Sequence, residues 1–99
     1  MKQYEALIIL KPELQSDALK ISFNEILDII KKYRCDIENV DEWGRRPLAH
    51  NIAKNTEGTY FLVKFKGEPE TITEINRGFS LNENILRAMV TVRRKEKVL

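Results

Sequence analysis

Residues 59–66 constrain the fold most strongly, because two sets of side chains alternate along them without a break. One set is Thr59, Phe61, Val63 and Phe65, and the other is Tyr60, Leu62, Lys64 and Lys66. Successive side chains of a strand point to opposite faces, so the first set, three of whose four members are large apolar residues, predicts a β-strand with one face in a core. The chain must therefore supply a second layer to cover that face.

Three further segments have the composition of strands. Residues 4–10 are β-branched-rich and apolar on both faces, which predicts a central strand that Pro12 ends. Residues 37–40 predict a second strand, which residues 48–52 continue beyond a bulge or bend at Gly44 and Pro47. Residues 55–58 predict the turn that follows, and residues 86–93 predict the last strand.

Two segments have the periodicity of amphipathic helices. Residues 17–33 place apolar side chains three and four positions apart, with Ser16 as the expected N-cap and Asp17 in the first turn. Pro69 precedes a second such pattern that ends near Leu81. These two helices are the layer that covers the sheet.

The order β-α-β-β-α-β predicts an α+β ferredoxin-like sandwich, a four-stranded antiparallel sheet with two helices on one face. Right-handed crossovers place the first and third strands in the centre. We expect one domain over residues 1–99, with a short basic C-terminal tail from about residue 94. The sheet would contribute to the core Ala6, Ile8, Leu10, Phe61, Val63, Phe65, Ala88, Val90 and Val92. The helices would contribute Leu19, Phe23, Ile26, Ile30, Ile72, Ile75 and Phe79.

The opposite face of the sheet has no helix to cover it and yet carries apolar side chains. Contiguous exposed apolar patches with a polar rim are typical of protein interfaces. We therefore predict a partner-binding face made of Glu5, Leu7, Ile9, Tyr60, Leu62, Lys64, Met89 and Thr91.

Composition excludes several classes of protein. A single cysteine, Cys35, cannot form an internal disulfide or a zinc site by itself. The longest apolar run, residues 6–10, is far shorter than the ~20 residues that span a bilayer. No signal-peptide cleavage site follows Met1, so we expect a cytoplasmic protein without membrane contact, metal or cofactor.

The net charge of +2 hides an uneven distribution. Residues 43–66 and residues 87–99 each hold five bases and one acid, a charge of +4 apiece, and the rest of the chain carries −6. Two basic segments on an acidic body suggest contact with a polyanion. In the first segment, adjacent Arg45 and Arg46 offer guanidinium groups that suit phosphate.

The stretch from Asp41 to Lys54, DEWGRRPLAHNIAK, closely resembles the signature of the bacterial small-subunit ribosomal protein S-six family. The Met-x-x-Tyr-Glu start and residues 84–90 resemble it too, so the similarity covers essentially the whole chain. Two positions depart from the pattern. Pro47 stands where a polar or charged residue is usual, and His50 stands where tyrosine is usual.

The resemblance implies a structural ribosomal protein that is not an enzyme and has no small-molecule substrate. It implies binding of small-subunit ribosomal RNA in the platform region, together with ribosomal protein S-eighteen on the open face of the sheet. The isolated protein would be a monomer. The candidate RNA contacts are Lys2, Arg45, Arg46, His50, Lys54, Arg87, Arg93, Arg94 and Lys95.

Other proteins with the same order of elements fit less well. An RNA-recognition motif needs stacking aromatics on its third strand, and residues 57–64 offer only Tyr60 on the open face. Acylphosphatases use an arginine in the loop after the first strand, and residues 11–15 contain none. A ligand-sensing homodimer that pairs through the open face remains a rival, and light scattering of the isolated chain would reveal it.

Overall fold

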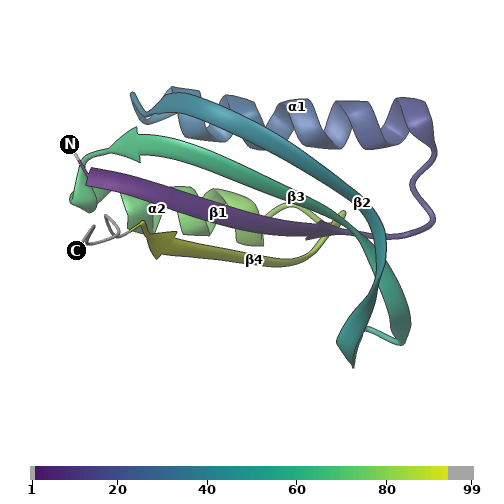
Figure 1. The fold of residues 1–99 in the computed structure, drawn as a ribbon. Coiled ribbons are helices and arrows are strands. Elements are labelled where there is room, and N and C mark those ends of the chain that lie inside the picture. The colour runs from purple at the N-terminus through teal and green to yellow at the C-terminus, as the bar shows by residue number, and fades with distance from the viewer. Residues whose placement is uncertain (1, 94–99) are drawn as a thin grey trace.

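The computed structural model describes residues 2–93 and confirms the predicted order of elements. Its strands are β1 (Lys2–Leu10), β2 (Asp36–Ile52), β3 (Asn55–Gly67) and β4 (Ile85–Val92), and its helices are α1 (Ser16–Lys32), η1 (Pro69–Thr71, a 3-10 turn) and α2 (Ile72–Ser80). The strands form one antiparallel sheet in the order β2-β3-β1-β4, with β1 and β3 in the centre. Figure 1 shows α1 and α2 on the same side of this sheet.

The core lies between that side of the sheet and the two helices. Alternation in β1 and β3 places Ala6, Ile8, Leu10, Phe61, Val63 and Phe65 there, all buried as predicted. The helices cover them with fully buried Ile26, Ile30, Ile75 and Phe79. Tyr4, two positions before Ala6 and therefore on the same face of β1, is also buried. The predicted core did not include it.

Strand β4 is less deeply covered than the prediction required. Ala88 and Val90 are half-buried against the core, but Val92 is 54% exposed. Its assignment to the core is therefore wrong. Val92 lies opposite Tyr4 at the end of an edge strand, where no second strand covers its outer side.

Helix α1 begins one residue earlier than predicted. Gln15, with extended backbone, precedes the helix, and Ser16 is its first residue instead of its cap. No side chain caps this end, so the expected Ser16 cap is wrong. The charges follow the helix dipole, with Asp17 in the first turn and Lys31 and Lys32 in the last.

The β2–β3 hairpin is longer than predicted, and its turn lies elsewhere. Ala53 and Lys54 both have positive φ, 48° and 66°, as in the type I′ turn that matches the twist of a hairpin. The Asn55 side-chain amide donates to the carbonyl oxygens of Ile52 and Ala53, each at 3.3 Å. Residues 55–58 therefore belong to β3, and the turn predicted there is wrong.

Strand β2 runs through both of the predicted irregularities. The register shifts between Glu42 and Gly44, where Gly44 has φ 78°, and this confirms a bulge at the glycine. Pro47 stays in the ladder opposite Glu57, which an edge strand permits because one row of its backbone donors needs no partner. The long hairpin curves away at one end of the sheet, and the start of β1 and the end of β4 lie at the other (Figure 1).

Among the helices of residues 2–93, none has the length and apolar character needed to cross a bilayer.

Candidate protein and nucleic-acid interface

The strand register arranges the open face of the sheet in rows across β3, β1 and β4. One row is Leu62, Leu7 and Met89, and the next is Lys64, Glu5 and Thr91. A third row is Tyr60, Ile9 and Arg87. These rows contain all eight residues of the predicted partner-binding face, on the side of the sheet that faces away from the helices.

A hollow of about 370 Å³ lies in the middle of this face. Its lining is Glu5, Leu7, Trp43, Leu62, Met89 and Thr91. Five of these six residues were predicted from sequence. We call this site the sheet hollow.

Trp43 is the lining residue that the sequence analysis missed. Its indole stacks on the Tyr60 ring, with centroids 6.2 Å apart and planes 10° from parallel, and it stays 40% exposed. Asp41, two positions earlier, pairs with Leu62 of the open face. The alternation of a continuous strand would have found Trp43, but the prediction ended the strand there.

Ile9 lies on the open face of the sheet by strand alternation, but its side chain is only 6% exposed. The backbone of Gly58, at the root of the hairpin, packs against it: a methyl group at position 58 would lie 2.5 Å from Ile9 Cγ2. This contact leaves little of Ile9 for a partner. Its place on the partner-binding face is therefore corrected, because the chain covers it with its own hairpin.

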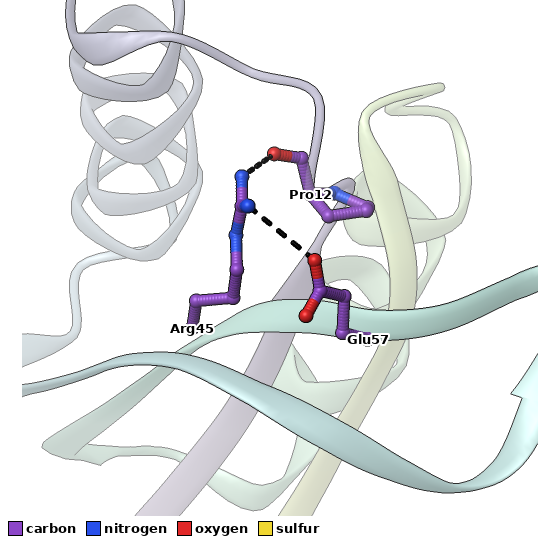
Figure 2. Close-up of polar contacts among 3 residues, drawn as sticks. All are labelled: Pro12, Arg45 and Glu57. Atoms are coloured by element: carbon purple, nitrogen blue, oxygen red, sulfur yellow. Dashed lines mark hydrogen bonds and ion pairs between the residues drawn. The ribbon is translucent and has the colours of Figure 1, made fainter.

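The two adjacent arginines, Arg45 and Arg46, have separate surroundings, because adjacent strand residues point to opposite faces. Figure 2 shows the Arg45 guanidinium held by two groups of the chain. It donates to the Pro12 carbonyl oxygen and forms an ion pair with Glu57, Nη1 to Oε1 3.3 Å. Arg46 instead donates from Nε to the Trp43 carbonyl oxygen at 3.3 Å and lies 5.4 Å from the centre of the indole.

The other candidate RNA contacts fall into groups at the two ends of the sheet. His50 and Lys54 are exposed in the hairpin, and Arg87 is exposed on β4 in the row of Tyr60. Lys2 pairs with Gly67 at the far end of the sheet, where Arg93 forms an ion pair with Glu38 at 3.5 Å. Arg94 and Lys95 lie outside the described residues.

Across residues 2–93 no cluster of three or more His, Cys, Asp or Glu side chains could hold a metal ion. Cys35 is buried beside Gly67, with its Sγ 3.6 Å from Thr71 Oγ1. His50 lies in the exposed hairpin at the opposite end of the sheet, so the two residues do not form a Cys–His pair.

Comparison with known proteins agrees with this arrangement. The family described as Ribosomal protein S6 matches residues 3–92. The small ribosomal subunit protein bS6 of Pseudarthrobacter chlorophenolicus is 40% identical over 99 residues, covering 100% of this chain and 98% of that protein. The bS6 protein of Clostridium novyi is 43% identical over 90 residues, covering 91% of this chain and 95% of that protein.

A solved structure shows the same fold. The crystal structure of 30S ribosomal protein S6 from Thermotoga maritima superposes with a TM-score of 0.88 at 22% identity, over 93% of this chain and 87% of that one. Sequence and fold lead to one conclusion: the chain belongs to the ribosomal protein S6 family, whose members are non-enzymatic components of the small ribosomal subunit.

Proposed function

We propose that this chain binds small-subunit ribosomal RNA in the platform region as a heterodimer with ribosomal protein S-eighteen. In this proposal the open face of the sheet binds the protein partner, and the basic groups at the ends of the sheet bind RNA. The sheet hollow is the observation that carries the proposal. It brings an exposed tryptophan and three apolar side chains together on a face of the sheet that no helix covers.

The open face has the anatomy of a protein interface. Leu7, Leu62 and Met89 form its apolar centre, and Met89 is 40% exposed. Glu5 and Thr91 border this centre on the neighbouring row. An apolar centre inside a polar rim, with an aromatic anchor such as Trp43, is the arrangement in which most binding energy concentrates.

The basic side chains of this chain are too dispersed to bind RNA tightly without a partner. One group lies on and beside the hairpin, and the other lies where β1 begins and β4 ends. Each can neutralise only a few phosphates, and such binding is weak and sensitive to salt. A partner that adds its own basic surface raises the effective concentration of both, so the pair binds RNA more tightly than either chain.

The side chains that we assign to RNA differ in how many contacts they already make within the chain. Arg45 is committed to Glu57 and Pro12, so its first role is to hold the hairpin in place. The other proposed contacts are Lys2, Arg46, His50, Lys54, Arg87, Arg93, Arg94 and Lys95, of which Arg93 is also in an ion pair, with Glu38. In this assignment Arg46 also borders the partner-binding face, because it lies over Trp43.

The test is a salt titration of binding to a small-subunit ribosomal RNA fragment. The lone chain, S-eighteen alone and the equimolar mixture are measured in parallel, with light scattering to establish the mass of each protein sample. We expect a monomeric lone chain with weak RNA binding and a heterodimer that binds tightly. If the lone chain binds RNA as tightly as the mixture does, or scatters as a dimer, the proposal is wrong.

Lys54→Gln locates the RNA contact within the same titration. Losing one phosphate contact reduces the log–log salt slope of the heterodimer by nearly one unit. Lys31→Gln, which removes the same charge from the exposed end of α1, is the matched control and leaves the slope unchanged. Equal slopes for both variants would remove the hairpin tip from the RNA contact.

A further inference from the structure

We propose that the sheet hollow receives an arginine side chain of the protein partner, with the guanidinium between the Trp43 indole and the Glu5 carboxylate. This inference rests on the proposed function, since it names what the open face recognises. The inference goes beyond the proposed function because it assigns one partner side chain, at one site, to the centre of the contact.

The size and floor of the hollow suit one long side chain. A volume of about 370 Å³ lies at the small end of the range of binding pockets. Leu7 and Leu62 lie directly opposite each other in the ladder, and Met89 adjoins Leu7 on its other side. These three apolar residues can cover the methylene stem of an arginine, which buries readily while its charged end stays polar.

The charge of the hollow selects a cation. Glu5 is the one charged residue among its six lining residues, and it takes part in none of the three ion pairs formed within residues 2–93. Lys64 lies directly across from Glu5 on β3 without forming such a pair. Asp41 adds a second carboxylate in the row of Leu62. A phosphate backbone would meet these carboxylates unfavourably, so the site suits a protein cation better than RNA.

The aromatic wall distinguishes arginine from lysine. A planar guanidinium stacks on an indole and can pair bidentately with a carboxylate, whereas an ammonium is a compact, strongly hydrated charge. The Trp43 ring already has the guanidinium of Arg46 5.4 Å from its centre. This contact places one guanidinium at the ring, and Trp43 still has 40% of its surface exposed for a second group.

The experiment measures the affinity of the chain for S-eighteen by calorimetry. Glu5→Gln is paired in double-mutant cycles with alanine variants of each arginine of the partner. We expect Glu5→Gln to weaken the binding of S-eighteen at least about tenfold. When one particular arginine of the partner is replaced by alanine, the wild-type chain and Glu5→Gln should bind it with equal affinity. Asp28→Asn, which removes the same charge from the exposed face of α1, leaves the affinity unchanged. Circular dichroism establishes that each variant is folded.

The outcomes separate this inference from the proposed function. If S-eighteen binds the wild-type chain but no arginine couples to Glu5, the inference is overturned and the proposed function stands. If S-eighteen does not bind at all, the proposed function fails, and the hollow is then tested with small probes.

Those probes are N-acetyl-arginine amide, N-acetyl-lysine amide and a single-stranded RNA oligonucleotide. NMR follows the indole N–H of Trp43, the one tryptophan of the chain. We expect millimolar arginine amide to shift this signal more than lysine amide does, and Glu5→Gln to remove the difference. Equal shifts from the two amides, or a larger shift from the oligonucleotide, would contradict an arginine site.

Discussion

Neighbouring residues of β1 have opposite surroundings, because successive side chains of a strand point to opposite faces of the sheet. Ile8 is fully buried beneath the helices, whereas Leu7 lines the sheet hollow. The same rule places Arg45 and Arg46 on opposite faces, so their adjacency in the sequence does not bring their guanidinium groups together. What could not be predicted is the partner of each guanidinium. Pro12 and Glu57 reach Arg45 only through the tertiary fold.

Ile8→Ala tests the assignment of the two faces. Removing a fully buried isoleucine leaves a cavity, and we expect the free energy of unfolding to fall by about 2–4 kcal/mol. Ile21→Ala removes the same atoms from a position that is 60% exposed on α1, and it should change stability by less than about 0.5 kcal/mol. Urea unfolding measures both. Similar losses for the two variants would contradict the buried position of Ile8.

Gly58→Ala tests the close contact that covers Ile9. A methyl group there would lie 2.5 Å from Ile9 Cγ2 and 3.1 Å from the Leu10 carbonyl oxygen, so one of them must move. We expect the free energy of unfolding to fall by about 1–3 kcal/mol, as it usually does when a packed site is overfilled. The loss should be smaller in an Ile9→Ala background, where Cγ2 is absent. Thermal melts of the four proteins measure it, and strictly additive losses would show that the two residues are independent.

The β2–β3 hairpin is the element on which sequence and structure differ most. Residues 55–58 contain Asn55 and Gly58, which are typical of turns, but the turn itself is Ala53–Lys54. Asn55 acts beside the turn through its side-chain amide, and Gly58 acts further along through its lack of a side chain. Composition could predict that these residues are special. It could not predict which property of each the fold uses.

Arg45→Ala tests whether this side chain positions the hairpin. The variant loses the link to the Pro12 carbonyl and the ion pair with Glu57, so the hairpin should open more often. We expect faster amide hydrogen exchange in residues 46–57, with a change in global stability below about 1 kcal/mol because the ion pair is exposed. Lys31→Ala, at the exposed end of α1, keeps both links and is the control. Unchanged exchange in Arg45→Ala would mean that the link does not order the hairpin.

At the scale of the whole molecule, the sheet has one face buried under the helices and one open face, and basic groups lie at both of its ends. The order of elements and the burial of one sheet face followed from periodicities of two and of three to four residues. The separation of the basic groups could not be predicted from these periodicities. Residues 43–66 and 87–99 are each basic overall, but each contributes to more than one surface. Lys64 lies on the open face, for example, while Lys54 lies at the hairpin turn.

Leu62→Asp tests the central claim that the open face is the binding surface for S-eighteen. The new carboxylate would enter the sheet hollow beside Leu7, away from the core, so the chain should stay folded. In a complex that carboxylate would be buried without a partner, which is strongly unfavourable. Leu81→Asp places the same charge on the helical side, at a position that is 76% exposed, and serves as the control.

The decisive measurement is the dissociation constant of S-eighteen for the wild type, Leu62→Asp and Leu81→Asp, each shown to be folded by its thermal melt. The account predicts that Leu62→Asp weakens binding at least about a hundredfold, as a loss of 3 kcal/mol or so requires, while Leu81→Asp binds like the wild type. A folded Leu62→Asp variant with wild-type affinity would contradict it, and the open face would then not be where the partner binds.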